Sequence, residues 1–190
     1  MIGKNERKKI QYRKELFEKN PDDYKIHKGF TDYDRNFSIW SKFFDLPEVT
    51  KDDVILDFGC AVGFSILIGR ELGYNVRGVD VEYKGPYKGV DKYREKYGTD
   101  KYIEIYDGYN LPYPDNTFTI ITSKASLDKF NSDKRNDDET IITEMITKRL
   151  EEFDRILTRK RLVISSVIQF MRSDEWESHN IKFKHYKFRN

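Results

Sequence analysis

Short runs of hydrophobic residues occur at intervals along this polar chain and predict its strands. The run VILDF (54–58) is apolar at four of five positions without alternation, which is typical of a parallel strand covered on both faces. The segments NVRGVDVE (75–82), TFTIITS (117–123) and RLVISSVIQF (161–170) predict three further strands of the same sheet. The segments KYIEIYDG (101–108) and NIKFKHYKF (180–188) alternate between apolar and polar residues, as half-exposed or edge strands do.

Helical spacing separates these strands. The segments 63–73 and 86–98 end at Gly73 and Gly98, and glycine commonly closes a helix. Between Asp137 and Leu157 the apolar residues recur at steps of three and four, which predicts a long amphipathic helix. Two or three more helices are expected in residues 1–50. Strands alternating with helices predict an α/β fold, with helices on both faces of a mostly parallel sheet.

Length and charge limit the function classes. A chain of 190 residues is expected to form one domain, with a helical N-terminal cap at 1–50 and the sheet core at 53–190. The 35 basic and 33 acidic side chains leave a net charge of +2, which weighs against a protein that coats nucleic acid. One cysteine allows no internal disulfide, and we expect no metal site. Without an apolar run of membrane-spanning length or a secretory signal, we expect a soluble cytoplasmic protein.

The stretch ILDFGCAVGFSILIGRELGYNVRGVDVE (55–82) carries the main chemical signal. Gly59 and Gly63 follow a strand and precede a helix, where the lack of a Cβ lets backbone amides approach a ligand. Asp80 ends the next strand, where a carboxylate can accept hydrogen bonds from both ribose hydroxyls. The glycines could instead form only a tight turn, and Asp80 could only cap a strand. The ordered series of strand, loop, helix, strand and carboxylate favours a nucleoside site.

Two other nucleotide sites fit this stretch poorly. A dinucleotide fingerprint needs three glycines, whereas the corresponding positions here are Gly59, Ala61 and Phe64. A P-loop needs Lys and then Ser or Thr after its last glycine, and the residues after Gly63 are Phe64 and Ser65.

Four separated segments resemble the class I S-adenosylmethionine-dependent methyltransferases. They are ILDFGCAVGF, GVDVE, EIYDGYNLPYPDNTFTIITS and FDRILTRKRLVIS, in this order and at compatible spacing, and they cover roughly residues 53–168. The likeness is strongest to the small members with an LPFPDNSFD segment. It implies a Rossmann-like three-layer sandwich with a mostly parallel seven-stranded sheet, an antiparallel last strand and N-terminal helices.

The resemblance also implies roles for individual residues. It implies that S-adenosylmethionine is the cofactor, with Asp80 on the ribose, and with Asp107 and Gly108 near the adenine amino group. Ser123, with Lys124, would border the sulfonium and the methyl acceptor. The residues that would surround the methionine part of the cofactor are Asp57, Gly59, Cys60, Ala61 and Gly63.

Departures from the family pattern fall inside the motifs. Ala61 replaces the commonest second glycine, Thr119 stands where an aspartate is usual, and TRKRL replaces the common Lys-Pro-Gly-Gly turn. The segment YKGPYKG replaces the usual helix start after Glu82. Little sequence follows Phe170, so we expect residues 1–50 and the loop after Ser123 to recognise the acceptor.

Methyl transfer from a sulfonium mainly requires alignment of the acceptor, with a base where the acceptor is a hydroxyl. None of His27, His179 and His185 lies in a motif. His27 is the best candidate base, because the N-terminal region is expected to cover the site. Cys60 is expected to pack behind the loop rather than act as a nucleophile. An Asn-Pro-Pro-Tyr motif is absent, which weighs against methylation of DNA adenine.

The first hypothesis is therefore a methyltransferase that acts on a hydroxyl of a small molecule or glycan. A second is a non-catalytic member of the fold that binds cofactor or serves as a partner subunit. A third is an RNA or protein methyltransferase guided by the basic chain ends, although such charges are more often solvated faces. The sequence leaves the acceptor and the oligomeric state open.

Overall fold

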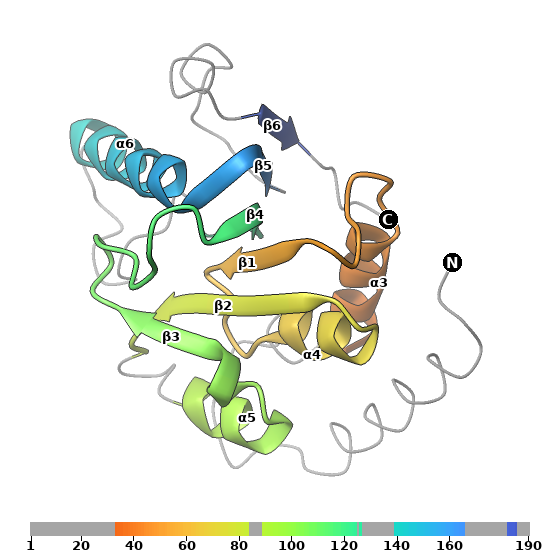
Figure 1. Ribbon diagram of the computed structural model, residues 1–190. Helices are drawn as coiled ribbons and strands as arrows, with labels where there is room; N and C mark the ends of the chain where they lie inside the picture. The colour runs from red at the N-terminus through yellow and green to blue at the C-terminus, as the bar shows by residue number, and fades with distance from the viewer. Residues whose placement is uncertain (1–32, 84–88, 125, 127–138, 166–181, 186–190) are drawn as a thin grey trace.

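The computed structural model describes residues 33–83, 89–124, 126, 139–165 and 182–185. Its centre is a sheet whose strands lie in the order β3-β2-β1-β4-β5-β6 (Figure 1). The strands are β1 (Val54–Phe58), β2 (Asn75–Val81), β3 (Ile103–Tyr106), β4 (Phe118–Ser123), β5 (Leu157–Ser165) and β6 (Lys182–His185). Each of the six strands overlaps a segment that the hydrophobic pattern predicted.

Every strand pair in the described residues is parallel. The expected seven strands with an antiparallel last strand are therefore not confirmed. The described part has six strands, and β6 pairs with β5 in the same direction, with Leu162 opposite Lys182. Sixteen residues, 166–181, separate the two strands. That separation has the length of a parallel crossover, whereas an antiparallel neighbour needs only a short hairpin.

The helices are α3 (Tyr33–Phe44), α4 (Phe64–Glu71), α5 (Val90–Tyr97) and α6 (Glu139–Ile156), with a short 3₁₀ helix, η2 (Asp100–Tyr102). The helices predicted at 63–73, 86–98 and 137–157 are thus confirmed, each slightly shorter than expected. Gly98 ends α5 in the left-handed conformation, at φ +63°. Of the predicted N-terminal helices, α3 is described and residues 1–32 lie outside the described part. No helix in the described ranges is long and apolar enough to span a membrane.

The helices cover the two faces of the sheet and form three layers (Figure 1). On one face, α3, α4 and α5 pack on Ile55, Val76 and Ile120. On the other face, α6 packs on Leu56, Val79 and Ile121 through Leu150, Phe153 and Ile156, all buried. Since neighbouring residues of a strand point to opposite faces, a strand such as VILDF needs apolar residues at successive positions.

The end of α6 passes into β5 without a loop. Phe118 pairs with Leu157, but the next pair is Ile120 with Leu162, so the register shifts in this stretch. The residues between Leu157 and Leu162 are Thr158–Arg161, which belong to the TRKRL segment (158–162) that departs from the resembled pattern. Regular pairing of β5 with β4 thus begins at Leu162, close to the predicted strand start at 161.

Candidate functional site

Most of the predicted site residues lie at the carboxyl ends of three neighbouring strands, β2, β1 and β4. The chain moves outward from β1 to β2 and β3 on one side, and to β4, β5 and β6 on the other. Ligands of open α/β sheets bind at such a reversal of strand order. Register places Asp57 of β1 beside Gly78 of β2 and Thr122 of β4. Asp80, two residues after Gly78, therefore shares a sheet face with Asp57.

Left-handed backbone shapes the loop between β1 and α4. Gly59 has φ +73° and Gly63 has φ +82°, values that glycine adopts without strain. Ala61 also has a positive φ, +51°, which is uncommon for a residue with a Cβ. This conformation explains why glycine would suit that position. Its amide is well placed, since the Ala61 N–H donates to Oδ2 of Asp80 at 2.6 Å.

The segment after β4 touches the same loop. A Cβ on Gly59 would lie 2.2 Å from Cβ of Ser126, so only glycine allows this approach. The hydroxyl of Ser126 donates to the Gly59 carbonyl at 3.2 Å. Lys124 donates through Nζ to Oδ1 of the buried Asn36 at 2.6 Å. The end of β4 is thereby tied both to the glycine loop and to α3.

Asp57 is the most deeply buried carboxylate of the site. Its Oδ2 accepts a hydrogen bond from the hydroxyl of Ser65, and its Oδ1 has no hydrogen-bond partner among the described residues. Burial raises the pKa of Asp57 to about 7, while the Ser65 hydrogen bond and the positive charge of Lys124 act in the opposite direction. Near neutral pH the carboxyl group of Asp57 is therefore partly protonated.

Asp80 is also buried, and its carboxylate already has several partners. Oδ2 accepts from the Ala61 N–H and from the hydroxyl of Tyr83 at 3.1 Å, and Oδ1 accepts from the Val81 N–H at 2.8 Å. Nη2 of Arg94 lies 3.5 Å from Oδ2. Burial raises the pKa of Asp80, although Arg94 and the hydrogen bonds oppose the change.

Cys60 packs as the sequence predicted. A Cβ on Gly78 would lie 2.6 Å from Sγ of Cys60, so the missing side chain of Gly78 makes room for the thiol. Burial raises the pKa of Cys60 well above its usual range, which keeps the sulfur protonated. A buried neutral thiol is a poor nucleophile.

Asp107 lies in a different environment. Its side chain is exposed and forms a turn of its own, with Oδ1 accepting from the N–H groups of Tyr109 and Asn110 at 2.8 Å each. Hydrogen bonds from Asn110 and then Tyr109 lower the pKa of Asp107. Gly108 follows with φ +93°, again a left-handed residue. These two residues form a turn directly after β3, where the sequence placed them.

Two residues of α6 bind the loop at residues 111–115. Oε2 of Glu152 accepts from the Leu111 N–H at 2.7 Å, and Arg155 donates to the carbonyls of Leu111 at 3.0 Å and Tyr113 at 2.7 Å. Arg155 also pairs with Glu152 at 2.7 Å and with Asp115 at 3.0 Å. We refer to Glu152 and Arg155 as the α6 clamp.

Ser123 and Thr122 end β4 beside Phe58 and Asp57. Both hydroxyls are buried and have no hydrogen-bond partner in the described part of the chain. Ser123 thus lies at the end of β4 next to the glycine loop, and its place beside the sulfonium stays a prediction.

The structure brings together most of the predicted residues, namely Asp57, those of the loop 59–63, Asp80 and Ser123. Asp107 and Gly108 follow β3, the edge strand beside β2. His27 lies outside the described residues, as does His179, and the side chain of His185 is not described. No cluster of three potential metal-binding His, Cys, Asp or Glu side chains occurs among the described residues.

Sequence reasoning missed Arg94 and Tyr83, two side chains that contact the carboxylate of Asp80. A signal for Arg94 was present, because it shares a helix face with Val90, Tyr93 and Tyr97, all buried. A charged residue on the apolar face of a helix is informative, since burial of an unpaired charge is strongly unfavourable. Tyr83 had no comparable signal.

The chain matches a known family over its central part. The model of a family described as a methyltransferase domain matches residues 56–159. This range includes the glycine loop, Asp80, Asp107 and the α6 clamp, and exceeds half of the chain. No curated protein matches the chain significantly.

Solved structures with a similar chain path come from several organisms. The PH0226 protein of Pyrococcus horikoshii is 20% identical, with a TM-score of 0.47, over 67% of this chain and 53% of that one. The YcgJ protein of Bacillus subtilis is 21% identical, with a TM-score of 0.44, over 64% and 47%. The CcbJ methyltransferase of Streptomyces caelestis is 14% identical, with a TM-score of 0.45, over 66% and 45%. The matched region spans about half the length of each of these proteins.

Proposed function

The chain belongs to the methyltransferase-domain family, whose members are class I S-adenosylmethionine-dependent methyltransferases, and we propose that it methylates a hydroxyl group of a small molecule or glycan. Bound S-adenosylmethionine would supply a methyl group already activated by its sulfonium. The protein would then have to hold the cofactor, align the acceptor and exclude water.

One observation carries the cofactor proposal. Buried polar atoms without hydrogen-bond partners in the described residues gather at the carboxyl ends of β1 and β4, namely Asp57 Oδ1, Thr122 Oγ1 and Ser123 Oγ. Buried polar groups are normally paired, so each exception needs an explanation. A polar ligand that crosses these strand ends would provide the missing partners.

The residues present fit S-adenosylmethionine. Asp80 is an acceptor at the end of β2, where a ribose would lie, and the loop from Gly59 to Gly63 lies beside it, with the Ala61 N–H donating to its carboxylate. Asp57 would lie beside the methionine part of the cofactor. Asp107 and Gly108, in the turn after β3, would border the adenine.

The acceptor side would be formed by α3 and the segment after β4. The Lys124–Asn36 hydrogen bond supports this arrangement, because it connects α3 to the end of β4 beside the glycine loop. We therefore retain the proposal that the N-terminal region and the loop after Ser123 recognise the acceptor, with His27 as the candidate base.

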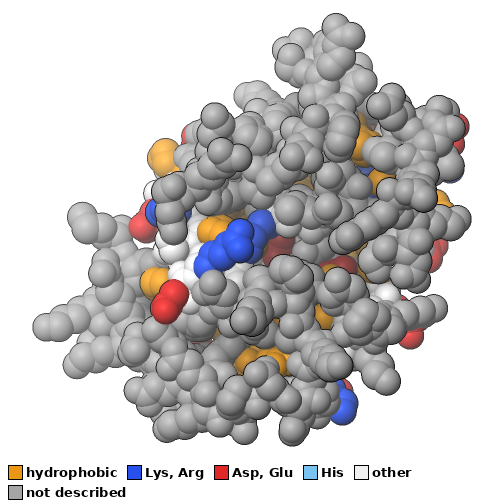
Figure 2. Space-filling view, turned by 180° about the vertical axis from the view of Figure 1, so that it is seen from behind, with side chains coloured by type: hydrophobic (Ala, Val, Ile, Leu, Met, Phe, Trp, Pro, Cys, Tyr) orange, Lys and Arg blue, Asp and Glu red, His pale blue; other side chains and the backbone are white. Residues whose placement is uncertain are grey.

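Charge does not favour RNA as the acceptor. The net charge of the chain is +2. On the face shown in Figure 2, the coloured side chains of the described residues mix basic, acidic and hydrophobic types. If the chain instead acts on RNA, its RNA affinity should fall steeply with salt, because phosphate contacts release counterions.

Calorimetric titration with S-adenosylmethionine and S-adenosylhomocysteine tests the proposal. We expect binding that Asp80→Asn weakens by about 1 to 3 kcal/mol, the scale of hydrogen bonds to a charged group. Asp52→Asn, at an exposed position before β1, is the matched control and should bind like wild type. A folded protein that binds neither compound would exclude the methyltransferase proposal and favour a non-catalytic partner subunit.

A further inference from the structure

Arg94 reaches from α5 into the region around Asp80. Its Nε donates to the Ala61 carbonyl at 2.8 Å and its Nη1 donates to Oδ1 of Asp91 at 2.9 Å. The residue is only 3% exposed. The guanidinium thus connects the helix, the glycine loop and the carboxylate at the end of β2.

One nitrogen of this guanidinium has no hydrogen-bond partner in the described part of the chain. Nη2 lies 3.5 Å from Oδ2 of Asp80, close enough for an ion pair but without a hydrogen bond. A buried donor of a charged group normally finds an acceptor, because its desolvation is otherwise uncompensated. The NH₂ group at Nη2 of Arg94 therefore indicates a missing acceptor beside Asp80.

The carboxylate of Asp80, in turn, accepts fewer hydrogen bonds than it can. A carboxylate offers about four acceptor positions, and three hydrogen bonds reach Asp80, from Ala61, Val81 and Tyr83. One acceptor position remains. A hydroxyl group, which both accepts and donates a hydrogen bond, can accept from one of the two N–H groups of Nη2 and donate to this acceptor position.

Tyr83 shows that a hydroxyl can approach this carboxylate next to the guanidinium. Its O–H donates to Oδ2 of Asp80, and its ring centre lies 5.5 Å from Cζ of Arg94. A ribose that uses both of its hydroxyls on Asp80 needs two acceptor positions. It would take the remaining position and displace the Tyr83 hydroxyl from the other.

We propose that Arg94 is a second ribose-binding residue, whose Nη2 donates to the oxygen of a cofactor hydroxyl that itself donates to Asp80. The proposal rests on the proposed function and assigns this chain a specificity residue for ribose over deoxyribose. A phosphate on the ribose does not fit as well, because its negative charge would lie against the Asp80 carboxylate.

Calorimetry with S-adenosylhomocysteine and its 2′-deoxy and 3′-deoxy analogues tests Arg94 directly. For the wild type we expect the loss of at least one hydroxyl to weaken binding about tenfold or more. For Arg94→Met we expect S-adenosylhomocysteine to bind about tenfold more weakly, and the discrimination against that deoxy analogue to shrink to roughly threefold or less. A purely structural role would weaken all three ligands equally.

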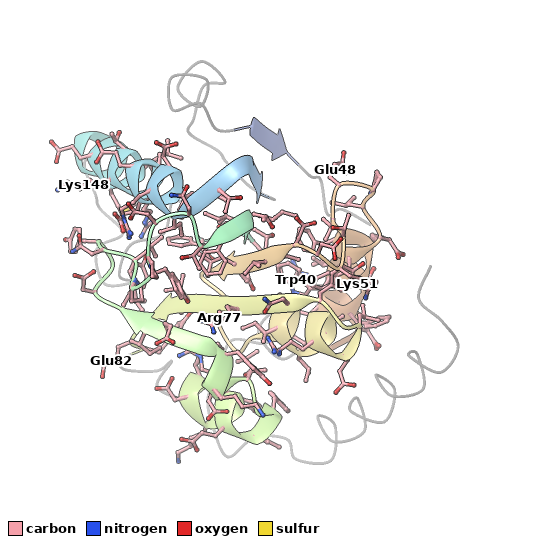
Figure 3. All side chains as sticks on the ribbon, in the orientation of Figure 1. Trp40, Glu48, Lys51, Arg77, Glu82 and Lys148 are labelled. Atoms are coloured by element: carbon pink, nitrogen blue, oxygen red, sulfur yellow. The ribbon has the colours of Figure 1, made fainter. Side chains whose placement is uncertain are left out.

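The controls separate this inference from the proposed function. Arg77→Met replaces an exposed arginine of β2, labelled in Figure 3, and should leave affinity and discrimination unchanged. Arg94→Lys keeps the positive charge but has a single nitrogen, so it should also lose the discrimination between S-adenosylhomocysteine and the deoxy analogue. It serves as the test variant if Arg94→Met does not fold. Wild-type binding with unchanged discrimination in both Arg94 variants would overturn only the Arg94 proposal. Absence of binding to folded wild type would overturn both proposals.

Discussion

The carboxylates of Asp80 and Asp107 follow neighbouring strands, β2 and β3, but the protein holds them in opposite ways. Asp80 is buried, and its partners come from the glycine loop, the strand end, Tyr83 and α5. Asp107 is exposed, and the hydrogen bonds it accepts come from its own turn. The first carboxylate depends on tertiary contacts, whereas the second depends on its own turn, residues 107–110.

The difference extends to the surroundings of each carboxylate. On the β1–β2 side, burial makes each polar atom energetically important, and the unpartnered oxygen of Asp57 lies there. On the β3 side, the loop is attached from outside by the α6 clamp, at the partly exposed Arg155. We therefore expect substitutions on the β1–β2 side to change protonation and binding, and substitutions on the β3 side to change mainly stability.

The largest effect is expected from Asp57→Asn. Burial raises the pKa of Asp57 from 3.8 to about 7, so between these values the folded protein holds a proton that the unfolded chain has lost. The wild-type free energy of unfolding should therefore fall by about 3 kcal/mol from pH 4 to pH 7 and remain lower above pH 7. The amide of the variant has no carboxyl proton to lose, so its free energy of unfolding should lack the part of the decrease with pH that Asp57 causes. The variant should therefore be more stable than the wild type at pH 8.

Urea denaturation of both proteins at pH 5 and pH 8 provides the measurement. The difference between the two proteins isolates Asp57, since Asp80 and other groups titrate in both. An equal pH dependence in wild type and variant would show that Asp57 is not the group responsible.

A smaller effect is expected on the β3 side from Arg155→Met. The variant removes donors from the carbonyls of Leu111 and Tyr113 and leaves Glu152 without its ion-pair partner. We expect the free energy of unfolding to fall by about 1 to 3 kcal/mol, with affinity for S-adenosylhomocysteine changed by less than roughly threefold. Urea denaturation and calorimetry measure the two quantities, with Arg77→Met as the matched control. A large loss of affinity without a loss of stability would contradict the expectation that substitutions on the β3 side change mainly stability.

The smallest effect is expected from Asp107→Ala. Its carboxylate is exposed and screened by water, so the change should weaken S-adenosylhomocysteine by no more than roughly threefold, compared with the larger loss for Asp80→Asn. Calorimetry on the two variants side by side tests the ranking. Equal losses would mean that the exposed carboxylate contributes as much to binding as the buried one.

Local patterns account for most of the fold that sequence analysis predicted. The strands at 54–58, 75–82 and 117–123 and the long helix toward Leu157 carry their periodicity in consecutive residues, and the structure has elements at these positions. The direction of the last strand was not predictable in this way. In the described residues β6 is parallel to β5, and hydrophobic periodicity does not encode the direction of a strand.

Likewise, the sequence alone located the glycine loop, Asp57 and Asp80, because strand, glycine, helix and carboxylate follow each other at short range. It could not assign partners to these carboxylates. Arg94 is 14 positions from Asp80 and 33 from Ala61, and only the packing of α5 against the sheet brings all three together. The chemical groups are therefore set by the order of residues along the chain. Their burial, their unpartnered atoms and the shifted pKa of Asp57 arise only when the helices exclude water from the strand ends.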